Sequence, residues 1–178
     1  MPIKQGGLDL LQHAASKELL QSRIPARLAY IWPDQTPRVV PIWFHWNGTE
    51  IVMATPPKAP KLKALAANPK VSLTIDDNEF PHKVLLVRGT ARMQPVNGIV
   101  PEYAVAAERY FGPKQGQAWV AQLSQIISSM IRIAVTPEWV GLIDFQTKLP
   151  APSIYRKVPW KRLSSADSRS FPNRVEGF

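Results

Sequence analysis

The sequence has no cysteine, only three histidines, and no apolar run long enough to cross a membrane. Without cysteine there is no disulfide, no thiolate metal ligand and no cysteine nucleophile. The histidines, His13, His45 and His82, lie far apart in the sequence without an i,i+4 pair, so we expect no metal site. The N-terminus lacks the apolar core of a signal peptide. We therefore expect a cytoplasmic protein without a membrane partner.

The motifs of several common enzyme classes are also missing. There is no G-x-S-x-G, no Gly-rich phosphate loop and no G-x-G-x-x-G, so nothing supports an α/β-hydrolase, a P-loop protein or a Rossmann domain. Acidic residues are in the minority, with 13 Asp and Glu against 22 Lys and Arg, which gives a net charge of +9. This balance favours an anionic partner, such as a phosphorylated small molecule, a nucleic acid or a membrane surface.

The hydrophobic pattern predicts about six strands with helices between them. Strands are expected at residues 27–32, 38–46, 50–55, 70–75, 84–92 and 132–145, and helices at 8–21, 62–67, 100–111 and 117–130. Asn47-Gly48 is typical of a two-residue hairpin in which both residues have positive φ. That hairpin and the very short helix after Lys61 favour an antiparallel, barrel-like sheet over the alternative, a parallel α/β fold. Within the strands, Gly89 is expected at a bulge or a close approach, and Thr136-Pro137 at an interruption.

Composition divides the chain into two parts. Residues 1–152 have the hydrophobic content of one folded domain, beginning with the N-terminal helix. Residues 153–178 hold six basic and two acidic residues and few aliphatic ones, which is typical of an extended, basic C-terminal tail.

A lysine-rich loop and helix are the first candidate site. Lys58, Lys61, Lys63 and Lys70 lie in a stretch without an acidic residue, and for any one of them an exposed, solvated position is the simpler interpretation. Lys61 stands where the loop after a strand enters a helix, so helix-end amides and its ammonium group could together bind a phosphate. Thr55, at the end of the preceding strand, could add a hydroxyl.

The strand that begins near Arg38 is the second candidate. Arg38, Val40 and Ile42 are expected on one face, and Val39, Pro41 and Trp43 on the other. Proline has no amide hydrogen to donate to a neighbouring strand. Pro41 therefore indicates an edge strand, a bulge or a backbone that faces a ligand. A flat heteroaromatic ring could lie against such a backbone. Trp43 has the alternative role of packing in the core or against a second subunit.

The order of these features resembles the pyridoxamine 5′-phosphate oxidase-like split-barrel flavoproteins. The resemblance covers roughly residues 20–147. It rests on Pro37-Arg38-Val39-Val40, a hairpin, Thr55 with Lys61 six residues later, a helix, then Asn68-Pro69-Lys70-Val71-Ser72-Leu73, and Gly89 at the end of the next strand. It implies a mainly β fold, a six-stranded antiparallel split β-barrel with flanking helices. It also implies a homodimer with FMN, or alternatively the deazaflavin F420, in a groove at the subunit interface.

The resemblance also implies which residues bind the cofactor. Arg38 and Lys61 would contact its phosphate with help from Thr55, and Val39–Trp43 would line its ring. The family often has Ser and Arg just before the key lysine, where this chain has Ala59 and Pro60, and Lys58 is the candidate substitute. The full set of expected cofactor-binding residues is Arg38, Val39, Val40, Pro41, Ile42, Trp43, Thr55, Lys58 and Lys61.

Three functions are consistent with these features. The first is an FMN-dependent oxidoreductase acting on an unidentified small molecule, in which the cofactor supplies the electron chemistry and no protein acid or base is required. The family's Arg-x-His element is absent after residue 152, so pyridoxamine phosphate oxidation is not expected. The second is an F420-dependent reductase, whose polyanionic cofactor would suit the positive charge. The third is a binding module without turnover, either for flavin or for nucleic acid. No nucleic acid is expected, because the basic residues match no known docking motif.

Overall fold

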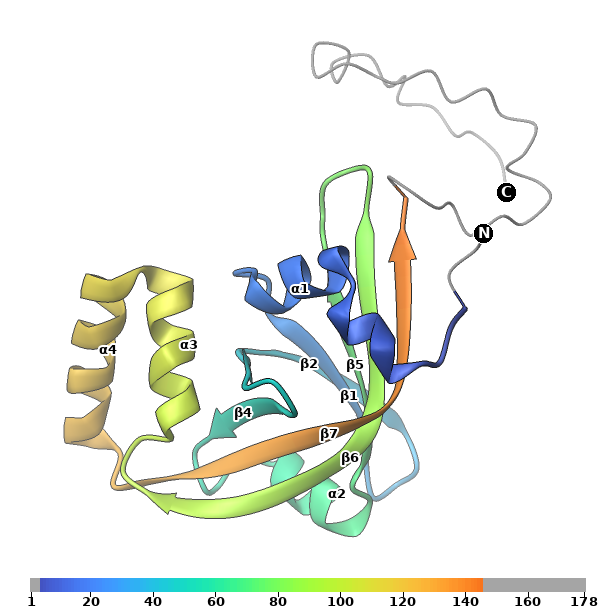
Figure 1. The fold of residues 1–178 in the computed structure, drawn as a ribbon. Helices are drawn as coiled ribbons and strands as arrows, with labels where there is room; N and C mark the ends of the chain where they lie inside the picture. Colours follow the sequence, from blue (N-terminus) through green and yellow to red (C-terminus); the bar gives the residue numbers. More distant parts are fainter. Residues whose placement is uncertain (1–3, 146–178) are drawn as a thin grey trace, which may run out of the picture.

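The computed structural model describes residues 4–145, which form one curled antiparallel sheet with helices around it (Figure 1). The strand order is β2-β1-β5-β6-β7-β4-β3. The strands are β1 (Ala26–Ile31), β2 (Pro37–Ile42), β3 (His45–Trp46), β4 (Ile51–Thr55), β5 (Lys70–Asp76), β6 (Lys83–Asn97) and β7 (Ser129–Asp144). The fold is the mainly β split barrel expected from the sequence. The predicted basic tail, 153–178, lies outside the described residues.

The strand number differs from the prediction, seven instead of six. The predicted strand 38–46 is divided into β2 and the two-residue β3, because Phe44 between them turns inward and is fully buried. The loop that follows is also longer than expected. It spans residues 47–50, and of its first two residues only Gly48 has a positive φ. The Asn47 side-chain oxygen instead accepts hydrogen bonds from the amides of Thr49 and Glu50, which closes the loop.

The helices are η1 (Leu8–Gln12), α1 (Ala14–Gln21), α2 (Lys61–Ala67), α3 (Pro101–Phe111) and α4 (Pro113–Ile126). The single helix predicted for 8–21 is two helices, since His13 has an extended backbone and its Nδ1 accepts from the Ala15 amide, capping α1. The helix predicted for 117–130 begins earlier, at Pro113, and ends at Ile126. No helix in residues 4–145 is both long and apolar enough to span a membrane.

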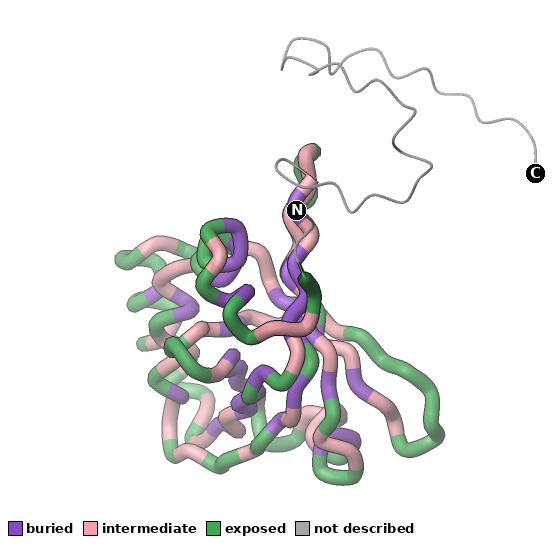
Figure 2. Tube along the Cα trace, turned by 45° about the vertical axis from the view of Figure 1, so that its right-hand side comes forward, coloured by how far each residue is buried: buried purple, intermediate pink, exposed green. Residues whose placement is uncertain are grey.

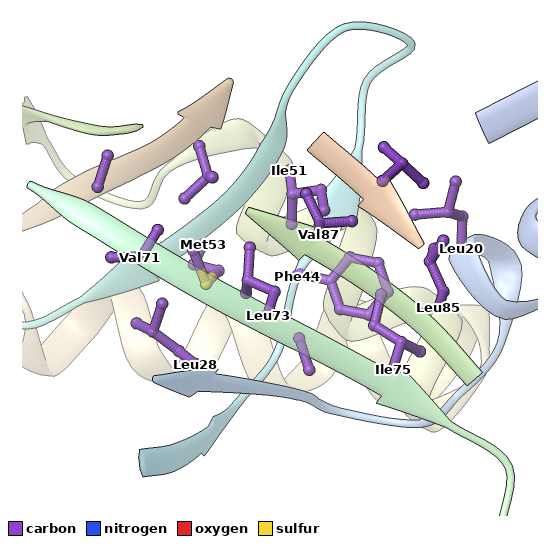
Figure 3. Packing of buried hydrophobic residues seen from close by; sticks show 14 of the residues in the cluster. Leu20, Leu28, Phe44, Ile51, Met53, Val71, Leu73, Ile75, Leu85 and Val87 are labelled. Carbon is purple, nitrogen blue, oxygen red and sulfur yellow. The ribbon is translucent and has the colours of Figure 1, made fainter. Parts of the chain in front are cut away.

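The core fills the inside of the curled sheet. In Figure 3, Phe44 points into a cluster with Leu73, Ile75 and Leu85, all fully buried. Along β5 buried and partly exposed residues alternate, as expected for a strand with one face toward the core. Figure 2 shows the consequence for the whole molecule, with buried segments inside the sheet and exposed ones on loops and outer helix faces.

The long strands β6 and β7 pair along their whole length and form the spine of the barrel. Their register shifts by one residue between Arg88 and Gly89, where Arg88 faces Trp139 and Gly89 faces Pro137. A Cβ atom at Gly89 would lie 2.1 Å from the Thr136 carbonyl oxygen, so only glycine fits. Gly89 is therefore at a bulge with a close backbone approach, as predicted.

Candidate functional site

Thr55, Lys58 and Lys61 follow one another from the end of β4 to the start of α2. Thr55 is buried opposite Ile131 of β7, whereas Lys58 is exposed in the connecting turn. Lys61 begins α2 and is partly buried. The predicted order of strand end, turn and helix start is confirmed.

Lys61 differs from the lysines around it because its ammonium is partly buried without a counter-ion. No described residue forms an ion pair or hydrogen bond with the Lys61 side chain. Burial lowers the pKa of this ammonium group, because removing the charge from water disfavours the protonated form. An anion bound beside Lys61 would compensate that cost. Lys63, two residues later on the same helix, is exposed.

The first amides of α2 are less available than the sequence predicts. The Leu62 amide donates to the Ala59 carbonyl oxygen at 3.0 Å, and the Lys63 amide donates to that of Pro60 at 3.2 Å. Proline at position 60 has no amide hydrogen to contribute. A phosphate at this end of α2 would therefore be held mainly by side chains.

Arg38 lies near the start of β2, the edge strand of the sheet, opposite Tyr30 of β1. Its guanidinium group contacts its own hairpin: it is 3.6 Å from the Asp34 carboxylate and 5.4 Å from the Trp32 ring centre. Both members of the ion pair are about half exposed, so the pair adds little stability and leaves Arg38 accessible to an anion.

The rest of β2 alternates as predicted. Val40 and Ile42 pack against the core, while Val39 and Pro41 are exposed, Val39 to 64%. Pro41 is tolerated because β2 pairs only with β1 and its other edge has no strand neighbour among the described residues. A flat ring could lie along this edge.

Trp43 lies apart from these residues, in an aromatic cluster with α3. Its ring stacks on Tyr110, with centres 4.8 Å apart and planes 10° apart, and lies 5.8 Å from Tyr103. Phe111 meets it edge-on at 4.9 Å. In this structure Trp43 therefore packs helix against sheet. The sequence signal for its partners was the seven-residue spacing of Tyr103 and Tyr110, which places both on one face of α3.

A hollow of about 390 Å³ lies on the outer face of β1, β5 and β6. Lys70 and Arg88 flank it; Lys70 is paired with Glu138 at 3.0 Å, and Arg88 lies 4.1 Å above the Trp139 ring. Of β2 only Pro37 lines it. The hollow is therefore distinct from the predicted cofactor-binding residues.

A charge network that the sequence analysis missed joins α3 to β6, β7 and the loop before β4. Arg132 donates to Glu102 at 2.7 Å and to Glu50 at 3.3 Å, and Glu50 also accepts from Arg92. These residues are far apart in the sequence, so no local pattern could reveal the network. Its contacts join elements of the fold, which indicates a structural role.

His45 lies near this network, partly buried on β3. Burial and the nearby positive charge of Arg109 lower its pKa, and Glu102 opposes them. No group of three or more His, Asp or Glu residues within 4–145 is arranged to hold a metal ion.

Comparison with known proteins places this geometry in a family. Residues 12–144 match the family model described as pyridoxamine 5′-phosphate oxidase. No curated protein matches the chain.

Solved structures with the same fold differ in their described roles. An F420 reductase is 29% identical, covering 70% of this chain and 94% of its own, with a TM-score of 0.54. A conserved hypothetical protein from Mycobacterium tuberculosis is 22% identical, covering 81% and 91%, with a TM-score of 0.59. A heme storage protein from Vibrio cholerae is also 22% identical, covering 72% and 90%, with a TM-score of 0.51. The family model spans well over half of the sequence, so the chain belongs to the pyridoxamine 5′-phosphate oxidase family.

Proposed function

We propose that this chain binds a phosphorylated flavin-type cofactor, FMN in the first place, and acts as an oxidoreductase on a small molecule. One observation carries the proposal: Lys61 is a partly buried cation without a counter-ion among the described residues. Burying an unpaired charge costs free energy, and a phosphate beside it would recover part of that cost. Membership of the pyridoxamine 5′-phosphate oxidase family supports a flavin over other phosphorylated ligands.

The residues fit such a group in two places. Lys61 would hold the phosphate by a charge-assisted hydrogen bond, with Lys58 nearby in the exposed turn. Arg38 is accessible on β2, and the open edge at Val39–Pro41 would face the ring. When bound, the cofactor supplies the transfer of electrons or hydride; the protein positions it and excludes water. The substrate is a small molecule of unidentified structure.

A second candidate is an F420-dependent reductase. The likeness to an F420 reductase at 29% identity, with 94% of that chain covered, favours it. The net charge of +9 would also suit a cofactor with a polyanionic tail.

The proposed assembly is a homodimer with the cofactor groove between the subunits. An edge strand such as β2 closes a groove only when another surface faces it, and a second copy would supply that surface. The exposed Val39 side chain and the free edge of β2 are consistent with this arrangement.

The test is a titration of the purified protein with FMN and, separately, with F420, followed by absorbance and fluorescence. Lys61→Ala is expected to weaken binding of the true cofactor by about ten- to a hundredfold, the value of one charge-assisted contact. Lys63→Ala is the matched control, since it removes an exposed lysine from the same helix. Equal affinities for wild type and Lys61→Ala would refute the assignment, and binding of F420 alone would establish the second candidate.

A further inference from the structure

The hollow of about 390 Å³ on the outer face of the sheet has no part in the proposed cofactor binding. Its volume lies within the range of small-molecule sites, which is roughly 300–1,000 Å³. It is lined by residues of β1, β5 and β6, with Pro37 of β2 and Glu138 of β7 at its margins. All of these residues belong to strands, so the sheet itself determines the shape of the hollow.

One side of the hollow is apolar. Ala29 and Ile31 are partly exposed, whereas Leu28 and Tyr30, which alternate with them along β1, are buried. Because successive side chains of a strand point to opposite faces, Ala29 and Ile31 face outward into the hollow. Pro37 pairs with Ile31 and extends the apolar surface onto β2. An apolar group that binds here would gain free energy by leaving water.

Arg88 is the cation at the other side of the hollow, exposed on β6. Its guanidinium carbon lies 4.1 Å from the centre of the Trp139 ring. No carboxylate in the described part of the chain is paired with it. Stacking on a ring uses the face of a guanidinium group, so the N–H groups along its edge stay available to an anion.

The Trp139 ring that supports Arg88 is itself held in place. A Cβ atom at Gly141 would lie 2.6 Å from this ring, and one at Gly6 would lie 3.0 Å from its Nε1, so the ring packs against both backbones. The Gly6 amide in turn donates to the Val140 carbonyl oxygen at 2.8 Å. Because the ring is positioned before a ligand arrives, less conformational entropy is lost when Arg88 binds one.

The other charged groups at the hollow neutralise each other. The Lys70 ammonium donates to the two Glu138 carboxylate oxygens at 3.1 and 3.0 Å, and to the Thr90 hydroxyl at 2.7 Å. The Thr90 hydroxyl donates to Glu138 as well. Since Lys70 balances the charge of Glu138, the lining keeps the single positive charge of Arg88.

From these contacts we propose that the hollow binds a small carboxylate with an apolar body, of the arylalkanoate class. Arg88 donates to the carboxylate, and the apolar body lies on Ala29 and Ile31. Ala29 pairs with Ser72 and Ser72 pairs with Arg88, so two strand spacings, about 10 Å, separate the apolar surface from the cation. A ring joined to a carboxylate by a short chain spans this length. The inference goes beyond the proposed function and does not depend on cofactor binding.

Other occupants fit the hollow less well. Residues 153–178 carry six basic and two acidic residues, so the positive charge of Arg88 would repel them. A phosphate favours several cations, and the second cation here, Lys70, is already paired with Glu138. Lys61 and Arg38, the proposed phosphate-binding residues, do not line the hollow.

Calorimetric titration of the full chain with phenylpropionate tests the proposal, and a Kd of about 0.1–1 mM is expected for a ligand of this size. Phenylpropionamide has the same shape without the charge, and acetate has the charge without the apolar body. Each should bind about tenfold more weakly or less. Arg88→Met should weaken phenylpropionate binding by about tenfold or more. Arg27→Met is the matched control, since it removes an exposed arginine of β1 that does not line the hollow, and should bind as the wild type does.

Nuclear magnetic resonance locates the bound acid independently of any substitution. Phenylpropionate should shift the backbone amide signals of β1, β5 and β6 around Ala29, Ser72 and Arg88. The amide signals of α2 should stay unchanged. Since Arg88 is exposed, Arg88→Met should keep the fold, which circular dichroism verifies.

The outcomes separate this site from that of the cofactor. Lys61→Ala should lose cofactor affinity and bind phenylpropionate unchanged, so a failure of the cofactor proposal would leave the carboxylate site intact. Absence of phenylpropionate binding in the millimolar range, as expected if a second subunit covers the hollow, would overturn the proposal. So would equal affinities for the acid and its amide, or amide shifts confined to α2.

Discussion

Glu50 is the residue whose protonation should matter most to the stability of the barrel. Its side chain is only 14% exposed and bridges two arginines, Arg92 and Arg132. The hydrogen bond from Arg92 lowers the pKa of this carboxyl below its ordinary 4.5; burial opposes the shift and Arg132 reinforces it. A carboxyl with a lowered folded pKa binds fewer protons in the native state than in the unfolded state. Its stabilising contribution is therefore complete at neutral pH and is lost as the pH falls through the folded pKa.

We predict that Glu50→Gln lowers the free energy of unfolding by about 1–2 kcal/mol near pH 7, where the wild type has the ionised contacts. The difference should shrink at acid pH, below the folded pKa of Glu50, where the wild-type carboxyl is itself protonated. Urea denaturation at the two pH values measures both effects. Glu138→Gln is the control, because Glu138 and its partner Lys70 are more exposed, and its effect at neutral pH should be smaller. A loss for Glu50→Gln that is the same at both pH values would contradict the electrostatic explanation.

At the scale of elements, Arg109 fastens α3 to the barrel. Its guanidinium group donates to the Phe44 carbonyl oxygen and, at 3.2 Å, to the Leu20 carbonyl oxygen. It also lies 4.6 Å above the Phe44 ring. Its Nε is buried with no partner among the described residues, so the group is held by carbonyls and rings rather than by a carboxylate. A guanidinium group suits this position because its planar set of N–H donors can bond two carbonyl oxygens at once.

Removing the Arg109 guanidinium group should destabilise the packing of α3 and α4 on the barrel and leave the sheet intact. We predict that Arg109→Met lowers the free energy of unfolding by about 2–3 kcal/mol, since two carbonyls lose their donor. Hydrogen exchange should become faster in α3 and α4 and stay unchanged in β5 and β6. Arg88→Met is the control, because Arg88 is exposed and lies above the Trp139 ring, without a hydrogen bond or ion pair to α3 in the described part of the chain. Hydrogen exchange in α3 should therefore stay unchanged in this variant. Equal acceleration throughout the chain would mean that Arg109 stabilises the whole domain instead.

The same scale shows how far the sequence predicts the fold. Strands such as β5 were predictable because alternating burial leaves a period of two in the sequence. The divisions at His13 and Phe44 were not, because each depends on a contact with a partner that periodicity does not reveal. His13 caps the next helix through its side chain, and Phe44 turns into a core built from other strands.

The candidate site divides in a similar way. Its place in the sequence predicted that Lys61 lies where a helix begins. That no carboxylate of the described residues pairs with its ammonium group became visible only in the three-dimensional structure. Trp43 was expected beside the cofactor ring, and in the structure its ring stacks on Tyr110 of α3. The contact joins residues far apart in the sequence, so a local strand pattern carried no information about it.

For the whole molecule, the net charge of +9 gives the two proposed associations opposite responses to salt. Cofactor binding joins an anionic phosphate to Lys61 and is an attraction. Formation of the proposed homodimer joins two cationic chains and meets a repulsion. Dissolved ions screen both effects over about 10 Å at 0.1 M ionic strength.

We therefore predict that raising the sodium chloride concentration from about 0.02 M to about 0.2 M weakens cofactor binding and strengthens dimerisation. The cofactor Kd should rise and the dimer Kd should fall, each by several-fold. Fluorescence titration measures the first and sedimentation equilibrium the second. A dimer that dissociates as salt is added would instead be held by ion pairs between the subunits, and would contradict this prediction.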